Sequence, residues 1–109
     1  MGKKTKSRRR RSDRNFILYQ LKNTKTREIY IGISAVLGRA LHKTLRRRFA
    51  KHLSKALCAG KNWTLHKAMR KHPLEVWQPS IVQVVRGKKA AFRLEREAIR
   101  RLKPTLNSF

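Results

Sequence analysis

The chain has 109 residues, of which 30 are Lys or Arg and 5 are Asp or Glu, so its formal net charge is +25 at pH 7. This length fits one compact domain with a modest core. A compact state with so much self-repulsion is most easily explained by a polyanionic partner, and nucleic acid is the first candidate. The apolar residues, 39% of the chain, come in runs, which excludes a basic tail that is disordered throughout.

Several other classes of protein are excluded by the sequence pattern. No apolar run approaches the roughly 20 residues of a membrane-spanning helix, and no apolar segment follows the basic start, as a secretory signal requires. The basic residues are spread over all predicted elements rather than along one amphipathic helix, so no membrane partner is expected. The single Cys58 fits a reducing, cytoplasmic compartment, and one Cys with 4 His does not give zinc-finger spacing.

Residues 1–14 form a basic arm without apolar periodicity, which we expect to be disordered when free. One interpretation is a solvated tail that keeps the protein soluble. We favour an arm that lies along phosphates, because the rest of the chain is already basic. The arm residues expected to bind nucleic acid are Lys3, Lys4, Lys6, Arg8, Arg9, Arg10, Arg11 and Arg14. Residues 15–109 are expected to form the folded domain.

Two short strands joined by a polar turn are predicted over residues 16–32. The first strand carries apolar side chains at both alternating sets of positions, as in a strand buried on both faces. The second is a β-prone run that we expect to stop at Gly32. Antiparallel pairing would bring Tyr19 and Tyr30 into one cleft, although two such tyrosines are more often ordinary core.

A loop over residues 33–39 and an amphipathic helix over residues 40–57 are expected next. Arg48 and His52 lie four residues apart at the border of the apolar stripe, where a cation adjoins the core. An arginine there more often covers apolar surface with its stem than it acts in a site. The basic residues of this helix expected to bind nucleic acid are Arg46 and Arg47.

A second helix over residues 63–72 and a third strand over residues 76–85 follow. His66 and His72 are expected on the surface or in a groove, without a ligand role. Pro79 indicates that the third strand starts irregularly or lies at an edge of the sheet.

The last predicted helix, residues 90–102, carries two acidic residues with different surroundings. Glu97 lies outside among arginines, where an ion pair contributes only a few tenths of a kcal/mol. Glu95 points toward the apolar side, and a carboxylate there costs several kcal/mol unless a cation or a metal compensates. The alternatives are a structural ion pair with Arg48 and a metal ligand.

These residues resemble the motifs of the GIY-YIG endonuclease family over residues 15–109. Ile-Leu-Tyr at 17–19 stands where the family has Gly-Ile-Tyr, and Tyr-Ile-Gly at 30–32 matches its second triplet. The other matching elements are Arg48 with His52 four residues later, Glu95, and Asn107 at the end of Pro104-Thr105-Leu106-Asn107. Any one element is weak, but all occur in the expected order. The spacing from Glu95 to Asn107 is similar to that of the catalytic domain of excision-repair incision enzymes. The stretch from Trp63 to Trp77 is similar to the helix-rich middle of phage homing-type members.

The resemblance implies an α/β fold of the α+β type, a small three-stranded antiparallel sheet flanked by helices. It also implies hydrolysis of a phosphodiester bond, most plausibly in DNA. Glu95 would hold Mg²⁺ or Mn²⁺, because a hard cation suits a lone carboxylate with water and phosphate oxygens. Arg48 would stabilise the developing charge.

The remaining residues would support this chemistry in the family. Tyr19 or Tyr30 would orient or activate the attacking water, and the sequence does not decide between them. His52 would assist as a base or hold Arg48 in place. Asn107 would fix the geometry of the site, and Gly32 would let the backbone turn tightly beside it.

Two alternatives remain open. Composition alone favours a binding protein of ribosomal or nucleoid type, or an inactive descendant of the nuclease fold. An RNA substrate is also possible, because no residue visibly reads a 2′-hydroxyl. The sequence does not indicate an oligomeric state.

Overall fold

A computed structural model describes residues 14–36, 38–57 and 64–107 of the chain. The predicted arm contacts from Lys3 to Arg11 therefore lie outside the described residues. Arg14 lies inside them, and its carbonyl oxygen accepts a hydrogen bond of 2.9 Å from the Gly87 N–H. This residue of the predicted arm thus joins the folded domain.

Three antiparallel strands form one sheet in the order β2-β1-β3. Their bounds are Asn15–Asn23 for β1, Ile29–Ala35 for β2 and Trp77–Arg86 for β3. β1 is the central strand, and residues 16–19 are buried, because apolar side chains at both alternating sets of positions need cover on both faces. Pro79 lies on β3, an edge strand, where a missing N–H leaves no central ladder incomplete.

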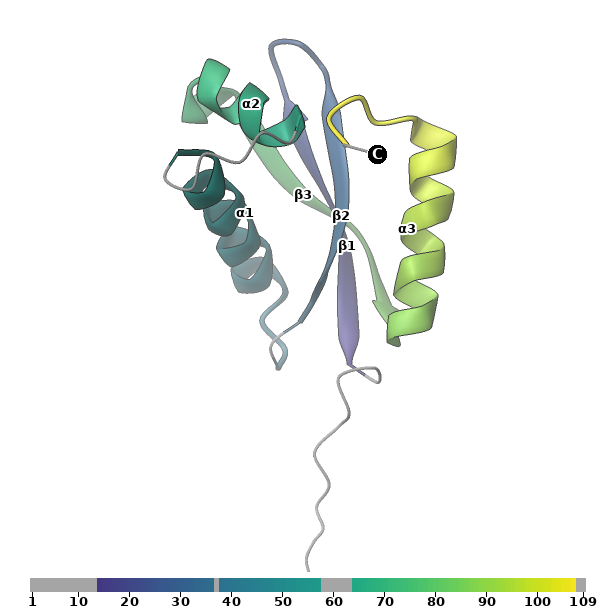
Figure 1. The fold of residues 1–109 in the computed structure, drawn as a ribbon. Helices are drawn as coiled ribbons and strands as arrows, with labels where there is room; N and C mark the ends of the chain where they lie inside the picture. The colour runs from purple at the N-terminus through teal and green to yellow at the C-terminus, as the bar shows by residue number, and fades with distance from the viewer. Residues whose placement is uncertain (1–13, 37, 58–63, 108–109) are drawn as a thin grey trace, which may run out of the picture.

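Helices cover both faces of this sheet, as Figure 1 shows. α1 (Leu41–Leu57) and α2 (Thr64–Lys71) lie on one side, and α3 (Lys88–Leu102) lies on the other. A 3-10 turn, Leu74–Val76, leads into β3. The predicted class, a three-stranded antiparallel sheet flanked by helices, is confirmed.

β2 extends further than the sequence indicates. It continues through Gly32 to Ala35, and Ile33 pairs with Leu18. The predictions that the strand stops at Gly32 and that residues 33–35 belong to a loop are therefore wrong. A glycine in a strand indicates either that the strand ends there or that a neighbouring group approaches its backbone closely. At Gly32 a neighbouring group approaches closely, since a Cβ would lie 2.6 Å from the Tyr19 hydroxyl oxygen.

The sheet separates two apolar clusters of different size. The larger lies against α1 and α2 and includes Ile17, Leu21 and Trp77. The smaller consists of Leu18, Ile31 and Ala98, with residues of β2 and of α3, Leu94 among them, packed on it. Within the described ranges, no helix combines the length and the apolar character that crossing a membrane requires.

Candidate active site

The two tyrosines lie on the same face of the sheet. Tyr19 pairs with Gly32 and Leu21 pairs with Tyr30, and alternate positions of paired strands share a face. The two tyrosine ring centroids are 6.2 Å apart. Tyr19 has 0% of its surface exposed, whereas Tyr30 is only half-buried. Tyr30 is therefore the tyrosine that a substrate could reach.

Gly32 provides the space for both rings. A Cβ atom at this position would lie 2.6 Å from the Tyr19 hydroxyl oxygen and 3.0 Å from a ring carbon of Tyr30. The glycines with positive φ in the described ranges are Gly38 and Gly87, so the prediction that Gly32 serves a tight turn is wrong. The residue is small because the tyrosines pack against the strand itself.

α1 brings two side chains to the Tyr19 hydroxyl. The Nε of Arg48 donates to the hydroxyl oxygen at 3.3 Å, and Nε2 of His52 lies 2.9 Å from it. His52 is buried, with 2% of its surface exposed, and Arg48 is half-buried. The spacing of four residues places both on one side of the helix, as the sequence indicates.

His66 extends this polar chain from α2. Its Nε2 lies 3.2 Å from Nδ1 of His52, and 0% of its surface is exposed. The prediction of a surface or groove position for His66 is therefore wrong. A signal was present, because His66 precedes the buried Met69 by three residues and so shares its helix face. His72, in contrast, is half-buried and lines a groove.

Burial determines the protonation of this chain. It raises the pKa of Tyr19 well above the ordinary value, and the hydrogen bond from Arg48 opposes it only in part. Burial, followed by the charge of Arg48, lowers the pKa of His52 to about 3. At neutral pH, Tyr19 is therefore a phenol and His52 a neutral imidazole.

Glu95 comes from α3, on the opposite side of the sheet. Its carboxylate is half-buried, and burial raises its pKa. Glu95 and Arg48 both belong to the residues that the structure describes, and it shows no ion pair between them. Glu97 is exposed, as expected. Glu95 therefore bears the cost of partial burial without the cation that the structural alternative would supply.

The pKa of Tyr30 is affected by residues from both sides of the sheet. Burial makes the largest contribution and raises the pKa of Tyr30, while hydrogen bonding from Tyr19 and the charge of Arg48 lower it. The charge of Glu95 raises the pKa of Tyr30 further. The ring of Tyr30 also meets that of His52 edge-on at 5.2 Å. Tyr30 thus lies within reach of charges from both sides of the sheet.

Asn107 fastens the end of the chain to the edge of the sheet. Its Oδ1 accepts from the Ile31 N–H and its Nδ2 donates to the Ile31 carbonyl, both at 2.9 Å. The N–H of Leu106 donates to the Ile29 carbonyl at 3.1 Å. These bonds hold the stretch of β2 that carries Tyr30 and Gly32, so Asn107 acts on the geometry of the site rather than inside it.

The donor set fits a metal ion held by one protein carboxylate. In the described ranges, no group of three or more His, Cys, Asp or Glu side chains is placed to hold a metal. Mg²⁺ keeps several waters and binds through one or two carboxylates together with substrate phosphates. Glu95, which is half-buried and has no ion pair with Arg48, supplies such a carboxylate.

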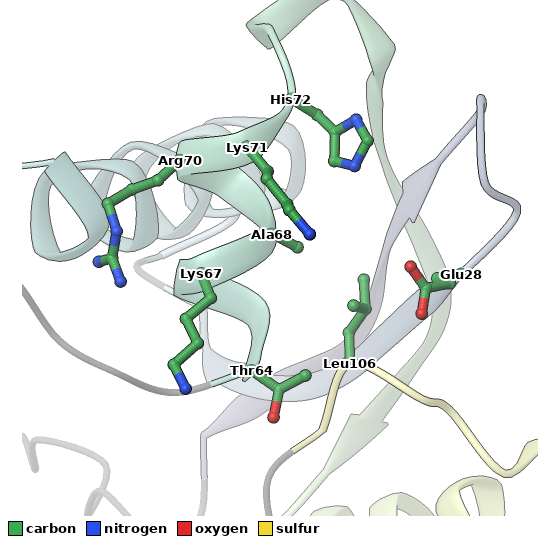
Figure 2. Close-up of a pocket in the computed structure, with 8 residues that line it drawn as sticks. All are labelled: Glu28, Thr64, Lys67, Ala68, Arg70, Lys71, His72 and Leu106. Carbon is green, nitrogen blue, oxygen red and sulfur yellow. The ribbon is translucent and has the colours of Figure 1, made fainter.

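Basic side chains lie beside the site and away from it. Arg46 and Arg47 are exposed on α1, and Arg47 and Lys51 line a surface groove together with Arg48. A different groove lies under α2, with Lys67, Lys71 and His72 on one side and Glu28 and Leu106 on the other (Figure 2). None of the residues around the second groove belongs to the tyrosine site.

Comparisons with known proteins agree with this geometry. The family profile described as the GIY-YIG catalytic domain matches residues 15–107. No curated protein matches the sequence. The solved catalytic domain of the homing endonuclease I-TevI is similar in fold, with a TM-score of 0.66 and 21% sequence identity. The similarity covers 86% of this chain and 95% of that domain.

Proposed function

Because this chain belongs to the GIY-YIG family and is therefore a nuclease, we propose that it cleaves duplex DNA with the help of a divalent metal ion. The reaction is hydrolysis of a phosphodiester bond. The reaction centre comprises Tyr30, Arg48 and Glu95, and Tyr19, His52 and Asn107 position these groups.

A duplex held by its phosphates is the substrate that the surface favours. The net charge of +25 suits a polyanion. Unpaired bases are usually held by stacking on aromatic side chains, and Phe92 is the one aromatic residue among the large exposed apolar side chains of the described ranges. Recognition through the backbone therefore fits better than recognition of splayed bases.

Arg48 neutralises the charge that develops on the scissile phosphate. Its guanidinium is always charged, and its Nε is fixed by the Tyr19 hydroxyl at 3.3 Å. A donor that is already oriented needs little reorganisation when the charge develops, which is how such groups lower a barrier. Tyr19 is therefore a positioning residue, and its buried hydroxyl has no access to substrate.

Tyr30 orients the attacking water and accepts its proton. It is the more accessible of the two tyrosines. Burial raises the pKa of Tyr30, so it is a phenol in the free protein, whereas hydrogen bonding from Tyr19 and the charge of Arg48 favour the phenolate that accepts the proton. Glu95 would hold the metal, which when bound supplies positive charge to the phosphate oxygens and the leaving group. A cation on Glu95 would also offset the negative charge that raises the pKa of Tyr30.

The observation that carries the proposal is that Glu95 is half-buried, that its charge acts on Tyr30, and that it has no ion pair with Arg48. The alternative of a protein that only binds nucleic acid leaves this residue without a purpose. A carboxylate repels phosphates, so a binding protein gains nothing from a partly buried one facing its ligand.

The test is a cleavage assay on supercoiled plasmid with wild-type protein, Glu95→Gln and Glu97→Gln. Glu97 is the matched control, because it lies on the same helix, carries the same charge and is exposed. We expect wild type and Glu97→Gln to nick or linearise the plasmid in Mg²⁺. Chelation by EDTA and the Glu95→Gln substitution should both abolish cutting, while plasmid retardation persists.

Two results would contradict the proposal. Equal retardation without cutting by all three proteins would indicate a binding protein. Cleavage by Glu95→Gln at the wild-type rate would exclude Glu95 as the metal ligand. A structured RNA assayed in parallel decides the substrate, because faster cutting of the RNA would overturn the choice of DNA.

A further inference from the structure

His66 lies outside the proposed reaction centre, yet it is fully buried and polar. It has 0% of its surface exposed and belongs to the same face of α2 as Leu65 and Met69. A leucine or methionine would fill this part of the apolar cluster without the cost of burying an imidazole. One polar contact of His66 is with Nδ1 of His52, at 3.2 Å.

The contact couples hydrogen positions along the chain. A neutral imidazole has one N–H donor and one bare nitrogen acceptor. His52 uses Nε2 toward Tyr19 and Nδ1 toward His66. The three side chains can therefore donate in one direction, from His66 to His52 to Tyr19, or in the reverse direction, and the hydrogen on His66 decides which.

The direction determines what Tyr19 can give to Tyr30. A phenol hydroxyl has one hydrogen and two lone pairs. If His52 and Arg48 both donate to the Tyr19 oxygen, the hydrogen of Tyr19 is left to point toward Tyr30, whose ring centroid lies 6.2 Å from that of Tyr19. In the reverse direction that hydrogen is used on His52, and Tyr30 receives none.

We propose that His66 is a positioning residue for the nuclease reaction: it donates Nε2–H to Nδ1 of His52, and thereby keeps His52 in the tautomer that donates to Tyr19. The Tyr19 hydroxyl then donates to Tyr30 in the accessible part of the site. His66 thus acts on the reaction through three hydrogen bonds, without touching substrate. The catalytic part of this inference rests on the proposed function.

Nuclear magnetic resonance of the histidine ring nitrogens tests the hydrogen positions without any cleavage. Nitrogen shifts distinguish an N–H from a bare nitrogen, and the chain has only 4 His to assign. We expect Nε2–H on both His66 and His52 in wild-type protein at neutral pH. A hydrogen on Nδ1 of His52 would show the reverse direction and overturn the proposal, whether or not the protein cuts plasmid.

The kinetic test compares His66→Leu with His66→Gln, because the amide of Gln can place an N–H near the position of Nε2. For metal-binding histidines, removal of the hydrogen-bond partner that orients the imidazole costs about 10- to 100-fold in activity, and we take this range for His52. We expect His66→Leu to lower kcat by that factor with KM unchanged, and His66→Gln to stay within a few fold of wild type. Met69→Leu is the control, because it alters the same buried face without touching a hydrogen bond.

A purely structural role predicts the opposite order. Leucine would then be the better replacement in an apolar cluster, and the buried amide of Gln the worse one. His66→Leu cutting as fast as wild type, or His66→Gln cutting more slowly than His66→Leu, would overturn the proposal. If wild type itself does not cut, the proposed function fails, and the nitrogen shifts still decide the direction of the chain.

Discussion

The two sides of the sheet supply polar groups in different ways. On the side of α1 and α2, the hydroxyl and imidazoles of Tyr19, His52 and His66 are buried and joined by contacts of 2.9 and 3.2 Å. On the side of α3, the cluster of Leu18, Ile31 and Ala98 is apolar. The carboxylate that this side brings to the site, Glu95, has no ion pair with Arg48.

On the side of α1 and α2, the polar side chains are already in contact with one another in the free protein. On the side of α3, Glu95 has no such contact with Arg48. The hydroxyl of Tyr19 holds the Nε of Arg48 at 3.3 Å and is itself in contact with His52 at 2.9 Å, so the orientation of Arg48 is set when the protein folds. A partly buried carboxylate that lacks an ion pair with Arg48, as Glu95 does here, is stabilised when a cation binds to it. The charges of Arg48 and Glu95 both affect the pKa of Tyr30. Tyr30 therefore lies between a donor that is already oriented, Arg48, and the cation that would bind to Glu95.

The largest expected effect comes from Arg48→Lys, which removes the link between the polar chain and the substrate. An ammonium keeps the charge but loses the planar guanidinium whose Nε is held by Tyr19. We expect kcat/KM to fall by about 10²- to 10³-fold in single-turnover cleavage, with little change in the urea midpoint. Arg101 is exposed at the end of α3, so Arg101→Lys should cut at the wild-type rate. A rate for Arg48→Lys near that of this control would show that the guanidinium of Arg48 has no special role.

Gly32→Ala should damage both folding and cleavage, because the new methyl group would meet the rings of Tyr19 and Tyr30. The Cβ would lie 2.6 Å from the Tyr19 hydroxyl oxygen, and overpacking of this kind costs about 1–3 kcal/mol. Gly38→Ala is the control: its φ of 61° makes it strained, but its Cβ meets nothing within 4 Å. We expect Gly38→Ala to lose stability without losing rate. Equal rates for the two variants would show that the ring positions do not matter.

The stability of the protein should fall in mild acid because of His52. Burial lowers its pKa to about 3, below the ordinary value near 6.5. Between these values the unfolded chain binds the proton and the folded chain does not, so the free energy of unfolding decreases as pH falls below about 6.5, by about 1.4 kcal/mol per pH unit.

Urea unfolding at pH 7, 6 and 5 measures this slope, and His52→Gln, which does not titrate, should lose it. The raised pKa of Glu95 acts with the opposite sign. Because Glu95 is present in both proteins, the difference between their slopes isolates the contribution of His52. An unchanged slope in His52→Gln would contradict the burial of a neutral imidazole.

The smallest effect is expected from Asn107→Ala. The variant loses the two 2.9 Å bonds to the Ile31 peptide, but water can replace them in part at this edge. We expect a loss of about 1 kcal/mol in urea unfolding and a slower cleavage rate. Thr105→Ala, which loses one exposed bond to Glu28, should change neither; identical behaviour of the two variants would remove Asn107 from the positioning residues.

The features of the site that depend on the local sequence pattern could be predicted from the sequence. A strand pair brings Tyr19 and Tyr30 together wherever the hairpin pairs in that register, and helical spacing stacks Arg48 on His52. The apolar face of the last helix indicated that Glu95 is partly buried. Family motifs added the order of these residues and the position of Asn107.

The parts that failed depend on contacts between distant segments. Gly32 could not be distinguished from a strand end, because only the packed rings of Tyr19 and Tyr30 explain it. The polarity of His66 favours a surface position. Its burial depends on His52, which lies 14 residues away on another helix and is not indicated as a partner by the local pattern. The absence of an Arg48–Glu95 pair depends on the placement of α1 and α3 on opposite sides of the sheet.

The most direct test of the account is the single-turnover cleavage rate of Tyr30→Phe in saturating Mg²⁺. Tyr30 is half-buried, so loss of its hydroxyl should leave the urea midpoint nearly unchanged. If the preset donors and the recruited cation act on this hydroxyl, the rate falls by about 10²-fold or more. Cleavage by Tyr30→Phe at the wild-type rate would contradict the account, because the two sides of the sheet would then meet at a residue that the reaction does not use.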